Sequence, residues 1–108
     1  MGLAWGQITI AVLDFEGIGN LINLQYLYLD NNLIEGSIPV EFSNLLNLTY
    51  LYLSNNKLSG TINESICNID INWGSIATFR IGGNQICPPY PNCVLAFMGE
   101  QDITNCER

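Results

Sequence analysis

Two stretches of sequence decide the fold: LQYLYLDNN at residues 24–32 and LTYLYLSNN at residues 48–56. The second copies the first with a fixed offset, and the same offset relates Gly36 to Gly60 and Ile38 to Ile62. A fixed period of roughly 20 to 50 residues is the signature of a solenoid built from stacked repeats. The sequence therefore predicts a repeat architecture.

A third, weaker copy, FRIGGNQI at residues 79–86, follows the second. At the regular offset Leu51 would correspond to Ser75, but the third copy places Phe79 in that position. A short insertion therefore lies around residues 70–75, and it predicts a longer connection before the third strand.

The leucines of each copy alternate with tyrosines. In Leu27-Tyr28-Leu29 a period of two points the leucines inward and the tyrosine outward, as in a short strand. One such strand cannot bury its apolar face alone, so neighbouring repeats must stack in parallel. Inward asparagines at the turn after each strand can bond the backbone groups that the turn leaves unpaired. We therefore expect a structural asparagine ladder of Asn32, Asn56 and Asn84.

These segments resemble the leucine-rich repeat of the plant type, LxxLxLxxNxLxGxIPxxLxxL. Residues 24–47 match it closely, and the second copy departs at Asn63, where the family has proline. The resemblance covers about two thirds of the chain. It implies an α/β-type solenoid: a short right-handed superhelix with a parallel sheet on its concave face and a mostly irregular or 3-10 convex side. It also implies protein–protein interaction without naming the partner.

We divide residues 1–108, as one domain, into a degenerate first repeat (1–23), two regular repeats (24–47 and 48–71), a last repeat (72–86) and a C-terminal cap (87–108). In the first repeat Ile8–Leu13 alternates like a strand. The stretch from Ile10 to Ile18 is much shorter than the equivalent stretch from Leu27 to Phe42, so this repeat is expected to be shortened. An unsealed apolar end would favour association with another copy through the N-terminal repeat.

The cap is predicted from CPPYPNC at residues 87–93, because three prolines cannot continue a parallel ladder. The apolar segment VLAFM at 94–98 is suited to covering the last repeat. The tail at 99–106 is similar to the caps of secreted leucine-rich-repeat proteins of bacteria.

Four cysteines, Cys67, Cys87, Cys93 and Cys106, favour two disulfides over a zinc site, because the chain has no Cys-x2-Cys pair and no histidine. Disulfides persist in oxidising compartments, which predicts a secreted or cell-surface protein. Placing the cap in repeat register sets Cys93 one layer, roughly 5 Å, from the coil that holds Cys67. That favours Cys67–Cys93 with Cys87–Cys106. The alternative, Cys87–Cys93 with Cys67–Cys106, stays open.

Charge and composition exclude several functions. The formal net charge is −7, and Lys57, Arg80 and Arg108 are the only cations, too few to neutralise a nucleic-acid backbone. No apolar stretch approaches the roughly 20 residues that membrane insertion needs. The absence of histidine excludes the usual Ser-His and Cys-His nucleophiles. We therefore expect a protein that is not an enzyme, with no catalytic residue, no metal and no cofactor.

The outward residues of the strands are the candidate binding site. Four tyrosines form a two-by-two block, and tyrosine buries a large area at low entropy cost while keeping a hydroxyl for hydrogen bonding. The competing interpretation is that aromatic pairs merely stabilise the sheet. Ile8–Leu13 would add Thr9, Ala11 and Leu13. The predicted ligand-binding residues are Tyr26, Tyr28, Asp30, Tyr50, Tyr52, Ser54, Thr78 and Arg80.

These features predict a non-catalytic module that binds a protein or peptide on its concave face. Two alternatives remain: a structural module that self-assembles or is part of a longer solenoid, and carbohydrate binding through the tyrosines.

Overall fold

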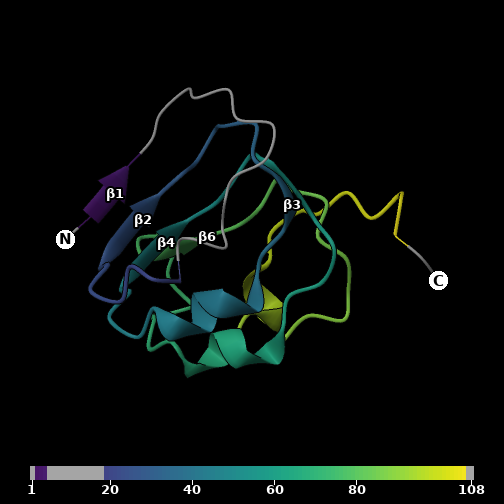
Figure 1. Cartoon of the computed structure of the whole chain (residues 1–108). Helices are drawn as coiled ribbons and strands as arrows, with labels where there is room; N and C mark the ends of the chain where they lie inside the picture. Colours follow the sequence, from purple (N-terminus) through teal and green to yellow (C-terminus); the bar gives the residue numbers. More distant parts are fainter. Residues whose placement is uncertain (1, 5–18, 107–108) are drawn as a thin grey trace.

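The main sheet has four parallel strands in the order β1-β2-β4-β6 (Figure 1). The structure, a computed structural model, describes residues 2–4 and 19–106. Tyr26 pairs with Tyr50 and Tyr28 with Tyr52, so the two regular copies stack in register at the offset of the sequence repeat. The strands are β1 (Gly2–Ala4), β2 (Tyr26–Tyr28), β4 (Tyr50–Tyr52) and β6 (Phe79–Arg80).

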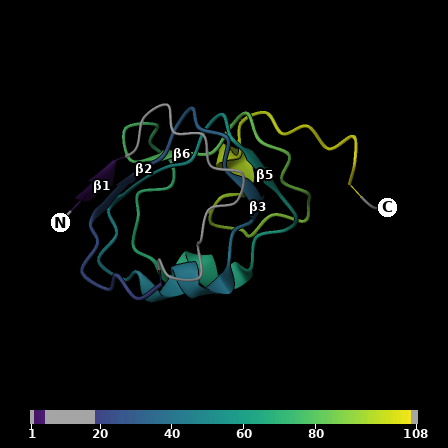
Figure 2. The same ribbon diagram turned by 45° about the horizontal axis from the view of Figure 1, so that its top comes forward.

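Each coil of the solenoid has three sides, and the main sheet forms the first of them. A two-stranded parallel sheet, β3 (Glu35–Ser37) with β5 (Lys57–Ser59), follows the main strands and was not predicted from the sequence. The 3-10 helices η1 (Val40–Asn44) and η2 (Glu64–Asn68) then lie side by side, across the core from the main sheet (Figures 1 and 2). A third 3-10 helix, η3 (Leu95–Phe97), belongs to the cap. The fold is therefore a leucine-rich-repeat solenoid, and none of the described residues forms an α-helix.

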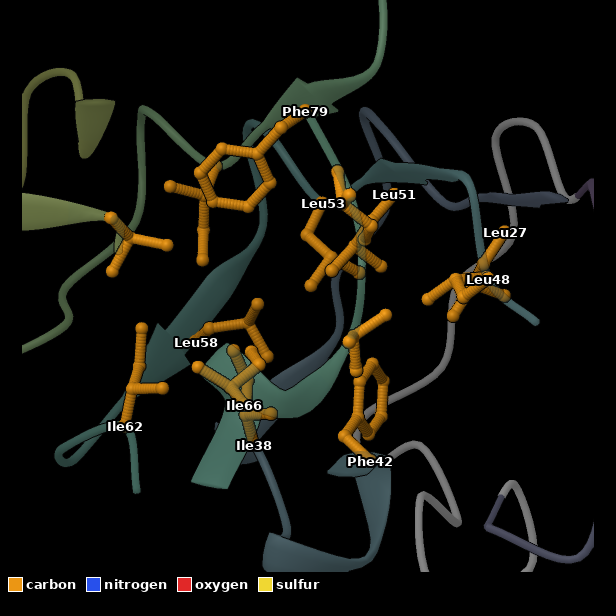
Figure 3. Packing of buried hydrophobic residues seen from close by; sticks show 14 of the residues in the cluster. Leu27, Ile38, Phe42, Leu48, Leu51, Leu53, Leu58, Ile62, Ile66 and Phe79 are labelled. Carbon is orange, nitrogen blue, oxygen red and sulfur yellow. The ribbon is translucent and has the colours of Figure 1, made fainter. Parts of the chain in front are cut away.

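The core lies between the main sheet and the 3-10 helices (Figure 3). The inward leucines of β2 and β4 and of the residues after them are fully buried, as the period-two alternation predicts. Burying one such side chain stabilises the fold by about 1.5–3 kcal/mol before chain entropy is counted. The largest fully buried side chains are Phe42, Leu24, Leu27, Leu29, Ile34, Leu45, Leu48, Leu51, Leu53, Leu58, Ile69 and Ile81.

Asn63, the departure from the plant-type pattern, takes the place of a proline without changing the backbone. Its φ and ψ are −71° and 141°, close to the −71° and 152° of Pro39 in the preceding coil. Its side chain accepts a hydrogen bond from the Ser65 N–H at 2.9 Å, which caps η2. The side-chain cap replaces the conformational restriction that proline gives.

The predicted position of the strand in the first repeat is wrong. The strand beside β2 is Gly2–Ala4, not Ile8–Leu13, and Gly2 pairs with Tyr26 as Tyr26 pairs with Tyr50. These strands are therefore regularly spaced, whereas the predicted shortening concerns residues outside the described part of the chain. Ile8–Leu13, with the candidate face residues Thr9, Ala11 and Leu13, lies outside the described residues, and the place assigned to it beside β2 is taken by β1. The error arose because Trp5 stands in the sequence where the repeat offset would place the counterpart of Leu29, which hides the leucine pattern.

Asparagines at equivalent positions form a buried column, Asn32, Asn56 and Asn84, that joins the coils. The Asn56 Nδ2 donates to the carbonyls of Leu29 and Leu53, at 2.9 and 3.1 Å. Its Oδ1 accepts from the backbone N–H groups of Asn32 and Ile34, both at 3.2 Å. Asn84 donates to the carbonyls of Leu53 and Ile81 in the same way. One amide thus satisfies backbone groups of two successive coils.

Gln101 extends this column into the cap. Its Nε2 donates to the carbonyls of Ile81 and Met98, at 2.9 and 2.8 Å, and its Oε1 accepts from the Ile86 N–H at 3.0 Å. Each ladder amide, from Asn32 to Gln101, bonds the carbonyl three positions before it. The cap is therefore a truncated coil. This was not predicted, because glutamine replaces asparagine and Gln101 follows Asn84 more closely than Asn56 follows Asn32.

Two disulfides fasten the cap. Cys67 of η2 bonds Cys93, and Cys87 bonds Cys106, each with a Cα separation of 5.7 Å. This is the pairing that the repeat register favours. Within residues 2–4 and 19–106, no helix is long and apolar enough to cross a bilayer.

Candidate functional site

Four tyrosines lie on the outward face of β2 and β4, because their side chains alternate with the buried leucines. The ring centroids of Tyr28 and Tyr52 are 4.6 Å apart, and those of Tyr26 and Tyr50 are 5.2 Å apart. Along β2, the rings of Tyr26 and Tyr28 are 6.2 Å apart. Tyr26 is 38% exposed and the other three are half-buried. The tyrosine block is thus one continuous aromatic surface with each ring partly open to solvent.

Arg80 of β6 extends this surface by one strand. Its guanidinium carbon lies 4.2 Å from the centroid of the Tyr52 ring, a cation–π geometry. Its Nη1 lies 3.8 Å from the Asp30 carboxylate, which is a loose ion pair. Its Nε donates a hydrogen bond to the Ile76 carbonyl at 2.8 Å, and the side chain remains 44% exposed.

Asp30 follows β2 and is partly buried. Its Oδ1 accepts a hydrogen bond from the Ser54 N–H at 2.7 Å. Burial raises the pKa of this carboxyl above its ordinary 3.8, while the Ser54 hydrogen bond and the Arg80 charge act in the lowering direction.

The surroundings of the Tyr28 phenol disfavour its ionised form. Partial burial raises the pKa of Tyr28 above 10.0, and the neighbouring phenols Tyr52, Tyr50 and Tyr26 add to the rise in that order.

Two of the predicted binding residues, Thr78 and Tyr52, use their hydroxyl groups in contacts with the loop before β6. The Thr78 hydroxyl contacts the carbonyls of Asn72 and Ser75, at 2.5 and 3.2 Å, in the loop before β6. The Tyr52 hydroxyl donates to the Ala77 carbonyl of that loop at 2.5 Å. The outward side of the sheet carries Tyr26, Tyr28, Tyr50, Tyr52, Asp30, Ser54 and Arg80, whereas the Thr78 hydroxyl is directed to the loop.

The loop before β6 holds site residues that sequence reasoning missed. It contains Ile76, which is 80% exposed, and Trp73, whose ring packs edge-on against Phe79 at 4.8 Å. The signal for it was the insertion around residues 70–75. No cluster of three or more histidine, cysteine or acidic residues able to hold a metal occurs in the described part of the chain.

Comparison with known proteins identifies the repeat. The family model described as leucine rich repeat matches residues 9–58. Among solved structures, the crystal structure of PEPR1–AtPEP1 superposes with a TM-score of 0.70 and 24% identity. The plant peptide hormone receptor RGFR1 in complex with RGF2 superposes with a TM-score of 0.67 and 26% identity.

Both likenesses cover 87% of this chain but only 13% and 14% of the structures matched. This chain therefore spans a small part of the length of those proteins. No protein of curated function is similar enough in sequence to match.

Proposed function

This chain is a leucine-rich-repeat protein with repeats of the plant type, and from that premise we propose that it binds a peptide or protein through the outward face of its main sheet. The observation that carries the proposal is the tyrosine block, in which four partly exposed rings lie together with Arg80 stacked at one side. Tyrosine and arginine are among the residue types most enriched where proteins bind proteins.

The two similar solved structures also support binding of a peptide, but they do not identify the residues that bind it. RGFR1 is a plant peptide hormone receptor and was solved with RGF2, and PEPR1 was solved with AtPEP1. We propose that the outward side of the main sheet is the concave face of a right-handed solenoid and that it binds the ligand. The ligand-binding residues are then Tyr26, Tyr28, Asp30, Tyr50, Tyr52, Ser54, Thr78 and Arg80.

The module binds its ligand and catalyses no reaction. It works outside the cytoplasm, secreted or at the cell surface, where its two disulfides are stable.

Selection of peptides tests the binding face. A displayed library of random peptides is selected on the oxidised protein, and the enriched peptides are titrated against the Tyr28→Ala/Tyr52→Ala variant. We expect at least a hundredfold loss of affinity, because two aromatic contact residues are removed. Leu46→Ala, which removes an exposed apolar side chain outside the main sheet, is the matched control and should bind normally. Unchanged binding by the folded double variant would exclude this face. A glycan array with the same variants tests the carbohydrate alternative.

Assembly is a second candidate function, favoured by the position of β1 at one end of the main sheet. A parallel strand at that edge can pair with another copy or with further repeats of a longer solenoid. Light scattering over a concentration series measures it. Dimers or larger species would favour assembly through the N-terminal repeat, and a monomer at every concentration would favour binding of a foreign partner.

A further inference from the structure

A small hollow opens at the C-terminal end of the tyrosine face, between β6 and the cap helix η3. Its volume is about 290 Å³, and most of its wall is apolar. Ile76 and Phe97 line it with apolar side chains, and Gly82 and Gly99 line it with bare backbone. Arg80 and Ser54, which also belong to the tyrosine face, are among its lining residues.

One coil lacks an outward side chain beside the hollow. Asp30, Ser54 and Gly82 occupy equivalent positions after β2, β4 and β6. The backbone does not require glycine here, since Gly82 is not among the residues with positive φ. A Cβ at Gly82 would meet its nearest neighbours, Glu100 N and Gly99 Cα, at 3.7 Å, an ordinary contact distance. A Cβ would therefore fit at Gly82 in ordinary contact with the cap backbone.

The insertion before β6 builds one wall of the hollow, and residues of the face hold that wall in place. The Ile76 carbonyl accepts a hydrogen bond from Arg80 Nε at 2.8 Å, and the next carbonyl, of Ala77, accepts one from the Tyr52 hydroxyl. In this anchored loop Ile76 is 80% exposed, and Phe97, which also lines the hollow, is 46% exposed. Contact with an apolar ligand group would remove these side chains from water, which favours binding.

We propose that this hollow is a subsite for one bulky apolar side chain, such as leucine or phenylalanine, of a peptide that lies across the tyrosine block. The inference rests on the proposed function of that face. Continuity supports it, because Arg80 and Ser54 line both the face and the hollow. Size supports it as well, because about 290 Å³ lies just below the roughly 300–1,000 Å³ of small-molecule pockets and suits a side chain.

A titration with N-acetyl-L-leucinamide tests the subsite without the natural ligand. In NMR spectra of the whole oxidised protein, we expect saturable shifts at Ile76, Gly82 and Gly99, and none with N-acetylglycinamide, which has no side chain. Gly82→Leu fills the hollow and should weaken binding at least tenfold. Asn44→Leu, which adds the same side chain on the exposed helix η1, should bind like the unmodified protein. Equal binding by Gly82→Leu, or shifts spread over other exposed apolar residues such as Ile22 and Leu46, would overturn the subsite.

Library-selected peptides separate this proposal from the one on which it rests. The subsite predicts one bulky apolar residue at a fixed position in the enriched peptides, and its replacement by glycine should weaken binding about tenfold to a hundredfold. Ile76→Ser is a second variant that should weaken the same peptides, and its 80% exposure makes it safe for folding. Peptides that need Tyr28 but tolerate glycine at every position would overturn the subsite alone. Enriched peptides indifferent to Tyr28 would overturn the proposed function.

Discussion

The tyrosine block and the asparagine column recur at the same spacing along the chain, yet one is exposed and the other is buried. Asn32, Asn56 and Asn84 are at most 7% exposed, and Asn56 and Asn84 each contact backbone groups of two coils. Tyr26 is 38% exposed, and its ring contacts other rings. Recurrence of a residue type therefore does not distinguish structure from function, whereas burial and the hydrogen bonds made do.

The physical difference lies in what each side chain would leave behind if it were removed. A buried backbone N–H or carbonyl without a partner costs about 1–3 kcal/mol, so no apolar group can replace a ladder amide. Removal of an exposed tyrosine side chain leaves no buried polar group without a partner, so its loss costs little stability. Residues of the second kind are free to serve a ligand.

The largest expected effect is on the column. Asn56→Ala should lower the free energy of unfolding by about 3–5 kcal/mol, because it removes the acceptor of two buried backbone N–H groups. The carbonyls of Leu29 and Leu53 each lose one hydrogen bond and keep the one from Asn32 or Asn84. Urea unfolding of the oxidised protein measures it. The control is Asn44→Ala on the exposed face of η1, expected within about 0.5 kcal/mol of the unmodified protein. A loss at Asn56 no larger than at Asn44 would refute the structural role.

The next effect tests whether the cap continues the column. Gln101→Ala should lower the free energy of unfolding by about 1–3 kcal/mol, since the Ile86 N–H and the Met98 carbonyl lose their bonds to this side chain. The Ile81 carbonyl keeps its hydrogen bond from Asn84. Hydrogen exchange should show faster exchange of the Ile86 amide. Gln101→Asn, one methylene too short, should not restore the stability. Full rescue by that asparagine would mean that the reach of the glutamine is unimportant.

A smaller effect on stability is expected from the tyrosine block. Tyr28→Ala should cost about 1 kcal/mol, the value of cross-strand aromatic pairs on a solvated sheet face. Tyr28→Phe keeps the ring pairs and should unfold within about 0.5 kcal/mol of the unmodified protein. Urea unfolding again provides the comparison. A loss as large as that of Asn56→Ala would mean that the block is principally structural.

The smallest effect concerns the charge pair at the side of the block. The pKa of Asp30 is raised chiefly by burial, so the folded chain binds its proton more readily than the unfolded chain does. Its contribution to stability therefore falls as pH rises from 3.8 through the raised pKa. Arg80→Met removes a charge that lowers this pKa and should raise it further, which a carbon-13 NMR titration of the Asp30 carboxyl measures. A lower or unchanged value would refute the coupling.

The sequence predicted what the repeat period controls. The inward leucines, the outward tyrosines and the ladder asparagines all follow from registered copies that stack at one offset. It did not predict features that depend on contacts between non-equivalent residues. The place of β1 was obscured by Trp5, the fourth ladder amide by a cap of irregular spacing, and the hollow by an insertion whose path only the folded chain reveals.

The central claim is that the tyrosine block, and not another surface, receives the ligand. An NMR titration of the oxidised protein with a library-selected peptide tests it most directly, because every backbone amide reports. We expect shifts concentrated at β2, β4 and β6, with Tyr26, Tyr28, Tyr50 and Tyr52 among the largest, and little change at β3, β5, η1 and η2. Shifts concentrated on the second sheet or the 3-10 helices, with the tyrosines unmoved, would contradict it.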